Sequence, residues 1–567
     1  MHRKLASPTF VLFTFAILNP ALKAQTKTTD ALGHPWYQHA VFYEIYPRSF
    51  MDSNGDGIGD LKGIASKLDY LHALGVDAIW IAPCFPSPQV DFGYDVSDYE
   101  NIDPMYGTLA DFDRLQKLGQ AHGIRIILDF VVNHTSDQHA WFINSRSSRT
   151  SEKRDWYIWR DGKGKNPPNN WISTFGGPAW KWDSFTNQYY YHYFYAQQPD
   201  LNWRNPAVVS AMYGTSEWWY KRGVAGFRLD AVDTLYEDPN LKDNPVLPGK
   251  NSLGDPNLDN KYNDKLPEVH TALQGLRTVA NKYGAVLIGE TWTEDVAELK
   301  TYYGAGHNEL QMPMDLMMTD LKFSAPVFRN HIKAVEAAGK WPVYVISNHD
   351  IVRAWNRYGD GLHNDQIAKD MAALYLTLRG TPIMNYGEEI GMQNNDPKRR
   401  EDVKDPIGRL GWPQEKGRDG ERTPMQWNGS PQAGFTKGTP WNPVAPTYKT
   451  YNVADELKDR NSILNWYKGL LALRHTNPAL LEGSYIALNQ NDPNVMSYLR
   501  KTTNRAAIVV INMSASPQNI NFDLSGQGLG ASATTLMTTQ ASLKNNSSVQ
   551  HLALEPFAVY VAEVKNK

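Results

Sequence analysis

The sequence predicts an α/β protein built on a (β/α)₈ TIM barrel, with a subdomain inserted after the third strand and a C-terminal antiparallel β-sandwich. Eight short apolar runs recur along the chain, and amphipathic segments lie between several of them, which is typical of a parallel barrel. Beyond residue 483 the pattern becomes alternating, β-branched and rich in Asn and Gly, which favours a sandwich. The eight predicted strands are Val41–Tyr46, Ala78–Ala82, Ile124–Val132, Gly226–Asp230, Ala285–Gly289, Leu310–Met314, Val343–Ser347 and Pro382–Tyr386.

Helix-like periodicity and breaks in the rhythm set the predicted domain boundaries. Residues 135–202 are polar, punctuated by Gly and Pro and crowded with Trp and Tyr, so they are assigned to the inserted subdomain. The barrel then comprises residues 36–134 and 203–482, and the β-sandwich comprises residues 483–567. The predicted helices include Leu68–Leu74, Asp111–His122, Val269–Lys282 and Gln366–Thr377.

The N-terminus reads as a secretory signal peptide covering residues 1–24. Two basic residues, Arg3 and Lys4, precede an apolar run from Phe10 to Leu18, and a small-residue cleavage site ends at Ala24. The apolar run is shorter than the roughly 20 residues that cross a bilayer. We therefore expect an exported protein, periplasmic or secreted, with no membrane attachment after cleavage; a retained anchor is the alternative.

Composition excludes some classes of partner. The formal net charge of −3 over 567 residues offers no field to hold nucleic acid or an anionic membrane. Cys84 is the only cysteine, so an intramolecular disulfide is impossible, and its apolar neighbours predict a buried packing thiol.

Three carboxylates stand at the ends of predicted strands. Asp230 and Glu290 are 60 residues apart, as are Glu290 and Asp350, an interval of two strand–helix units or of one unit with a long loop. Like charges gathered on one rim cost stability, because each raises the pKa of the others. Such a cluster suits cleavage of a glycosidic bond, which needs one carboxylate and one carboxylic acid. Ordinary loop acids are the alternative interpretation.

The segment from Asp52 to Asp60 alternates oxygen ligands with glycines. Asp52, Asn54, Asp56 and Asp60, with Ile58 completing the set, predict a structural Ca²⁺ site, and Mg²⁺ is also possible. The loop departs from an EF-hand, because its twelfth position is a glycine. The alternative is a turn in which these side chains cap their own backbone amides.

Three further residues of the predicted rim carry polar chemistry. His134 and His349 follow the third and seventh strands, where we expect hydrogen bonds to a substrate, and neither has a zinc-binding spacing. Arg228 precedes Asp230 by two residues and therefore shares its face of the strand. We expect Arg228 to keep Asp230 ionised and to lower the pKa of its carboxyl group; an unrelated salt bridge is the alternative.

Ordered motifs from Trp36 to the C-terminus give the chain its resemblance to a known family. They are Gly75–Trp80, Asp129–His134, Gln198–Asn202, Gly226–Asp230, Glu290, Asn348–Asp350, and Gly380–Pro382 with Gly387–Glu389. With them the chain resembles the α-amylase superfamily of glycoside hydrolases, in the branch of α-glucosidases and oligo-1,6-glucosidases. One departure is Asn385, where relatives usually carry a bulkier apolar or aromatic residue.

The resemblance implies roles for single residues. Asp230 is implied to be the nucleophile, Glu290 the general acid/base, and Asp350 the carboxylate that stabilises the transition state. Asp91 and Tyr94 match positions that hold the terminal glucose, and further contacts are implied for His134, Phe175, Arg228, His349 and Arg422.

These roles imply an exo-acting, retaining α-glucosidase that acts on short oligosaccharides and needs no organic cofactor. Ala231 follows the nucleophile, and in the family resembled here alanine at this position accompanies α-1,4 preference, whereas valine accompanies α-1,6 preference. Three alternatives remain: an oligo-1,6-glucosidase, a transglycosylase of the sucrose isomerase or trehalose synthase type, and a non-catalytic subunit like the transporter heavy chains.

Overall fold

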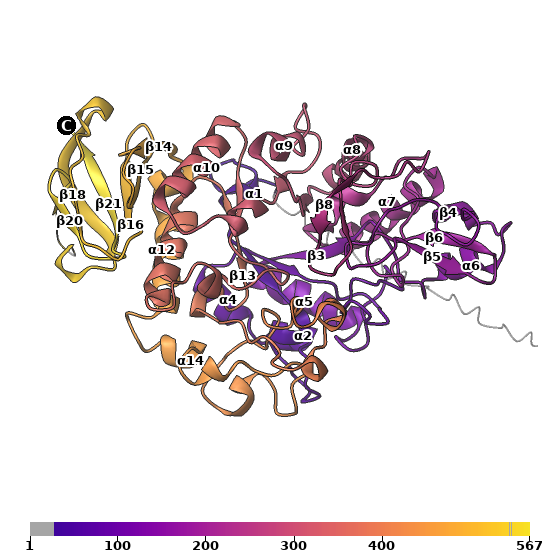
Figure 1. Cartoon of the computed structure of the whole chain (residues 1–567). Coiled ribbons are helices and arrows are strands. Elements are labelled where there is room, and N and C mark those ends of the chain that lie inside the picture. Colours follow the sequence, from indigo (N-terminus) through magenta and orange to yellow (C-terminus); the bar gives the residue numbers. More distant parts are fainter. Residues whose placement is uncertain (1–27, 544, 546) are drawn as a thin grey trace, which may run out of the picture.

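The computed structural model describes residues 28–543, 545 and 547–567, so the predicted signal peptide lies outside the described residues. Eight parallel strands form the central barrel (Figure 1), in the order β11–β10–β7–β3–β2–β1–β13–β12. A parallel bridge between Asp315 and Tyr344 joins the two ends of the sheet. The barrel prediction is confirmed. The strands are β1 (Phe42–Ile45), β2 (Ala78–Ile81), β3 (Arg125–Val131), β7 (Gly226–Asp230), β10 (Val286–Gly289), β11 (Met312–Pro313), β12 (Val343–Val345) and β13 (Thr381–Asn385).

Helices surround the barrel, and local chemistry sets where several of them begin and end. Helix α5 begins with a capping box between Thr108 and Asp111. Helix α4 ends at Gly75, whose φ of 103° suits glycine. The principal helices are α4 (Leu68–Leu74), α5 (Leu109–Ala121), α7 (Pro206–Lys221), α8 (Glu268–Asn281), α10 (Ala325–Ala337), α12 (Asn364–Thr377) and α15 (Ile463–Thr476).

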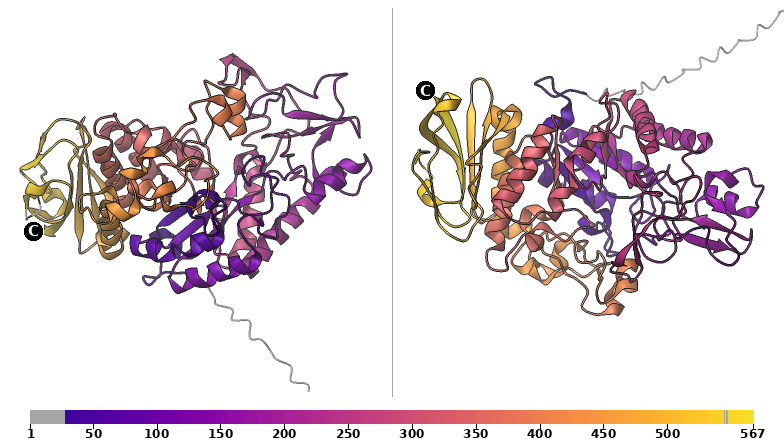
Figure 2. Two further views of the ribbon diagram at one scale, coloured as in Figure 1. Left: turned by 90° about the horizontal axis from the view of Figure 1, so that it is seen from below. Right: turned by 45° about the horizontal axis from the view of Figure 1, so that its top comes forward.

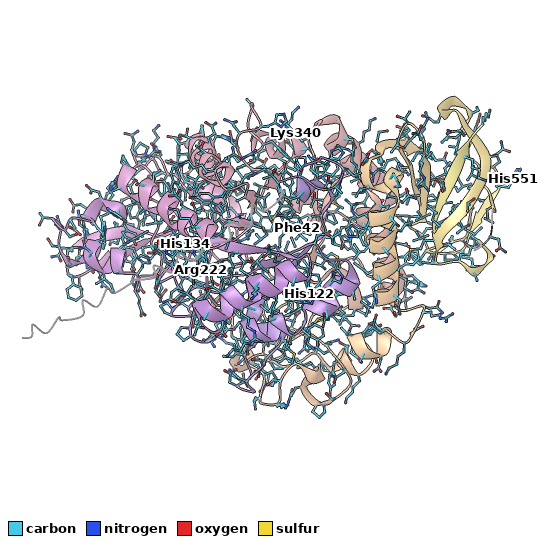
Figure 3. All side chains as sticks on the ribbon, turned by 180° about the vertical axis from the view of Figure 1, so that it is seen from behind. Phe42, His122, His134, Arg222, Lys340 and His551 are labelled. Carbon is cyan, nitrogen blue, oxygen red and sulfur yellow. The ribbon has the colours of Figure 1, made fainter. Side chains whose placement is uncertain are left out.

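The barrel interior changes from apolar to polar toward the carboxyl ends of its strands. Phe42 (labelled in Figure 3), Ile127 and Ile288 belong to one buried apolar cluster inside the barrel. Residues two positions apart share a face of a strand. Two positions after these three apolar residues stand Glu44, Asp129 and Glu290. The barrel interior is therefore apolar along the strands and charged at their carboxyl ends.

The inserted segment forms a small sheet next to the carboxyl end of the barrel. Its strands β4 (Trp159–Arg160), β6 (Gln188–Tyr191) and β5 (Trp180–Asp183) pair in that order, beside helix α6 (Ala140–Ser147). Buried aromatic side chains such as Trp171 and Tyr191 form its core. A hairpin of β8 (Val246–Lys250) and β9 (Pro256–Leu258) reaches the insertion, where Gly177 donates its N–H to Asp255 at 2.8 Å.

The C-terminal domain is antiparallel. Six strands pair in the order β14–β15–β16–β21–β18–β19, a second sheet pairs β17 with β20, and an apolar cluster lies between the two sheets. Arg500 donates to the carbonyl of Thr377 at 2.6 Å, which joins this domain to α12. The views of Figure 2 place the domain at the opposite end of the molecule from the insertion. The strands are β14 (Ser484–Leu488), β15 (Val495–Lys501), β16 (Ala506–Asn512), β17 (Gln518–Ile520), β18 (Leu529–Thr538), β19 (Ser547–Ser548), β20 (Leu552–Leu554) and β21 (Val559–Asn566).

Two remaining features concern the membrane and the single thiol. Among the helices of the described residues, none is long and apolar enough to cross a membrane. Cys84 is buried, and burial raises the pKa of its thiol, so it is an unreactive packing residue.

Candidate active site

Arg228 joins two of the three predicted catalytic carboxyls. Asp230 is the last residue of β7, and Glu290 follows β10 directly. The Nη1 atom of Arg228 lies 2.7 Å from Asp230 Oδ1, and its Nη2 atom lies 2.8 Å from Glu290 Oε2. Because both nitrogens belong to one planar guanidinium, the two carboxyl groups are held side by side.

The charge around Arg228 is unbalanced. Asp129 also contacts its Nη1 atom, at 3.0 Å, so three carboxyls share one cation. Burial raises the pKa of Asp230 well above its usual value, and Glu290 and Asp129 add to this, against the attraction of Arg228. Burial likewise raises the pKa of Asp129, to about 6. Arg228 lowers the pKa of Asp230, as expected, but burial outweighs this attraction, so the net pKa of Asp230 is raised rather than lowered.

Both oxygens of Glu290 accept hydrogen bonds from neighbouring N–H groups. Ala231 donates its backbone N–H to Oε2 at 3.0 Å, and the indole of Trp292 donates to Oε1 at 3.1 Å. The amide of Ala231 reaches Glu290 from a left-handed backbone conformation, with φ 47° and ψ 45°. The Trp292 side chain is 43% exposed, so it forms part of the open wall beside the acid.

Asp350 lies in a positively charged setting. Its Oδ1 atom contacts Arg422 closely and lies 3.1 Å from Arg418, and its Oδ2 atom lies 3.4 Å from His349 Nε2. Burial alone would raise the pKa of Asp350, but the charges of His349, Arg418 and Arg422 outweigh it and lower the pKa. Asp350 is therefore held as a carboxylate while the cluster around Arg228 is short of positive charge.

The remaining predicted sugar contacts form a connected network. Asp91 binds Arg418 at 2.8 Å and accepts from Gln198 at 3.1 Å. Gln198 also lies 3.1 Å from His134 Nε2, and burial lowers the pKa of His134 to about 3, so that ring is neutral. Figure 3 labels His134 at the side of the barrel from which the insertion extends. The tyrosine oxygen of Tyr94 lies 2.5 Å from His349 Nε2.

The structure also places Phe175 in this network and adds residues that the sequence did not single out. The guanidinium of Arg418 lies 5.3 Å from the ring centre of Phe175. Arg418 itself was missed, because nothing in its loop marks a residue that bridges separate parts of the chain. Glu44 and Asp129 had a usable signal, since each is a charge two residues after an apolar position in a predicted strand.

The predicted calcium loop is folded around its own backbone. Asp52 Oδ1 accepts the N–H groups of Asn54 at 2.9 Å and Gly55 at 2.7 Å, and its Oδ2 accepts that of Gly57 at 2.8 Å. Asp56 accepts the N–H of Ile58 at 2.8 Å. Within the described residues, no group of three or more His, Cys, Asp or Glu side chains is arranged to hold a metal ion. These contacts match the capped-turn alternative, and the calcium site stays a prediction.

The fold and the site define a class of protein. Two adjacent carboxyl groups at the carboxyl end of a barrel, with a third carboxylate among basic residues, are typical of the active site of a glycoside hydrolase. Residues 44–483 match the family "Alpha amylase, catalytic domain", and residues 485–561 match "Maltogenic Amylase, C-terminal domain". The chain belongs to the α-amylase family of glycoside hydrolases, as its motifs predicted.

Relatives within this family carry several activities in their names. A probable α-glucosidase of Rhizobium meliloti is 42% identical over 510 residues, which cover 86% of this chain and 92% of the relative. An oligo-1,6-glucosidase of Parageobacillus thermoglucosidasius is 41% identical over 517 residues, covering 84% and 90%. The crystal structure of the α-glucosyl transfer enzyme XgtA is similar with a TM-score of 0.84 and 40% identity, covering 94% of this chain and 99% of that one.

Proposed function

We propose that the chain is an exo-acting, retaining α-glucosidase with Asp230 as nucleophile and Glu290 as general acid/base. The observation that carries this proposal is the pair of carboxyls held by the two terminal nitrogens of Arg228. Retaining enzymes keep these groups about 5–5.5 Å apart, whereas inverting enzymes separate them further to admit a water. Side-by-side placement on one guanidinium supports the retaining arrangement.

The charge balance supports one retained proton within the cluster, and the proposed roles place that proton on Glu290. Asp129, Asp230 and Glu290 surround one cation, so together they favour the retention of a proton. With that proton on Glu290, Asp230 is the carboxylate that attacks the anomeric carbon while Glu290 protonates the leaving oxygen. Glu290 then takes a proton from the water that releases glucose.

The exo-action rests on the ion pairs that connect the rim. Arg418 contacts Asp91, Asp350 and Asp405, at 2.8, 3.1 and 2.7 Å, and thereby joins loops that follow β2, β12 and β13. A rim tied in this way favours a closed pocket for one terminal sugar over a groove open at both ends. The first sugar is therefore expected to be a non-reducing terminal glucose.

The α-1,4 preference rests on Ala231. Its methyl group is all that projects from the residue whose amide binds Glu290, so it leaves room beside the acid for the second sugar. A branched side chain there would narrow the space in which an α-1,4-linked ring turns. Differences of one or two methyl groups in a pocket are worth about 1–3 kcal/mol, so the preference is expected to be about tenfold to a hundredfold.

The test is product analysis with purified protein. Maltose, isomaltose, sucrose and trehalose are supplied separately, and the first anomer released is followed by NMR. We expect α-glucose from maltose at the highest kcat/KM, and loss of activity by several orders of magnitude in Asp230→Asn with an unchanged melting temperature. Release of β-glucose first, or an active Asp230→Asn variant, contradicts the mechanism.

Glucosyl transfer is a second candidate, favoured by two observations. The similar structure of XgtA belongs to an enzyme named for α-glucosyl transfer. Trp292 presents a partly exposed indole beside Glu290, which offers an acceptor sugar an aromatic surface. Rising maltose concentration distinguishes the two: transfer yields trisaccharide at the expense of free glucose, whereas hydrolysis yields only glucose.

A further inference from the structure

His349 is enclosed by groups that contact both ring nitrogens. Its Nδ1 atom makes a short contact with Glu44 Oε1, and its Nε2 atom faces Tyr94 at 2.5 Å and Asp350 at 3.4 Å. The ring stacks on Tyr94, with centroids 5.5 Å apart and planes 8° apart, and on Tyr46 at 5.7 Å. Neither packing nor hydrogen bonding leaves the imidazole free to rotate.

Glu44 is a buried acid to which the proposed mechanism assigns no role. It lies on β1, 1% exposed, and the ion pairs of the described residues give it one partner, His349. In the register of the barrel it stands opposite Asn385 of β13, so the two side chains share the interior face. Glu44 Oε2 and both amide atoms of Asn385 have no hydrogen-bond partner among the described side chains and backbone. Asn385 therefore gives this carboxylate a polar neighbour where an apolar residue would desolvate it further.

We propose that Glu44 is a positioning residue that keeps His349 as an imidazolium, so that Nε2–H points into the active site as a hydrogen-bond donor. A neutral ring that donates Nδ1–H to Glu44 presents a lone pair at Nε2 instead. Only the charged ring donates from both nitrogens, through Nδ1 to Glu44 and through Nε2 to the Tyr94 oxygen or to a sugar hydroxyl. The substrate half of this inference rests on the proposed function.

The charges around the ring agree with that assignment. Burial alone would lower the pKa of His349, but Asp350 and Glu44 outweigh it and raise the pKa, against the smaller opposing effect of Arg422. The other titratable groups that face the ring are Tyr94 and Tyr46. The Tyr94 hydroxyl in turn donates to Asp129 Oδ2 at 3.3 Å. Two anions in contact with the ring against one flanking arginine favour the protonated form.

The test replaces the charge and keeps the shape, in Glu44→Gln. Because the folded-state pKa of His349 is raised, its positive charge persists below that pKa and is lost as the pH rises through it. Removing Glu44 moves this loss to lower pH. We expect kcat/KM of Glu44→Gln to fall tenfold or more at pH 7.5 but less than threefold at pH 5.5, so that the pH optimum moves toward acid. The control is Glu401→Gln, an exposed acid paired with Arg399, for which no change is expected.

Nitrogen NMR of ¹⁵N-histidine-labelled full-length protein tests the proposal without any activity. With His349→Gln to assign the signal, both ring nitrogens are expected to be protonated at pH 7 in the wild type and only one in Glu44→Gln. This readout separates failure of the inference from failure of the proposed glucosidase activity. Glu44→Asp keeps the charge and should keep the wild-type signals even if Glu44→Gln melts early. Equal His349 signals in the wild type and Glu44→Gln, or a Glu44→Asp variant that behaves like Glu44→Gln, overturn the proposal.

Discussion

Arg418 offers the sharpest test of how the rim is held together. It is 14% exposed and contacts three carboxylates, Asp91, Asp350 and Asp405, within 3.1 Å. Arg418→Gln removes the cation and leaves these acids facing one another. Breaking a buried ion pair by deleting one partner costs about 3–5 kcal/mol. We expect a loss of that size in the free energy of unfolding of the barrel, because all three contacts depend on this one side chain.

The same substitution should reduce activity, since Asp91 and Asp350 both lose a partner that orients them. If about 3–5 kcal/mol of transition-state stabilisation is lost with that orientation, kcat/KM falls by about two to four orders of magnitude. Urea unfolding followed by tryptophan fluorescence, and initial rates with maltose, measure the two effects. Arg399→Gln is the matched control, because Arg399 is 65% exposed and solvent screens its ion pair with Asp402.

The pH dependence of the loss supplies a further check. Burial raises the pKa of Asp405, but Arg418 outweighs it and lowers the pKa to about 2. A lowered pKa contributes stability that is present above the unfolded value of about 3.9 and is lost as the pH falls through the folded value. The gap between wild type and Arg418→Gln should therefore narrow between about pH 4 and pH 2. A variant as stable as Arg399→Gln, with kcat/KM within threefold of wild type, refutes the reasoning.

Three further predictions concern the nucleophile, the linkage and the metal loop. Burial raises the pKa of Asp230 and only its ionised form attacks, so kcat/KM should fall with decreasing pH well before an unperturbed aspartate titrates at about 3.9; full activity at pH 4 contradicts this. Ala231→Val should shift the ratio of kcat/KM for maltose and isomaltose toward isomaltose. It should also lower the melting temperature, because a β-branched residue is strained at φ 47°. An unchanged ratio means that residues other than Ala231 set the linkage preference. If the Asp52–Asp60 loop binds calcium, EDTA should lower the melting temperature of the calcium-loaded protein, since a ligand of the native state stabilises it by mass action; an unchanged melting curve leaves the hydrogen-bonded turn as the full account.

The sequence by itself determined the barrel and its catalytic candidates. Apolar runs of strand length, separated by amphipathic segments, predict a parallel sheet covered by helices. The alternation within each strand predicts which face each side chain occupies. Asp230 and Glu290 were found because each ends such a run, and parallel strands deliver their carboxyl ends to the same rim. Carboxylates at the ends of strands can therefore be identified from the sequence alone.

Only the tertiary structure decided the electrostatics and the partners from distant parts of the chain. The pKa of Asp230 is raised because desolvation, which depends on everything packed around β7, outweighs the neighbour two residues away. Arg418 joins Asp91 across 327 residues, and Glu44 contacts His349 across 305. A single sequence carries no signal for such pairs, because Coulomb interactions depend on distance in space and on burial, neither of which follows from separation along the chain.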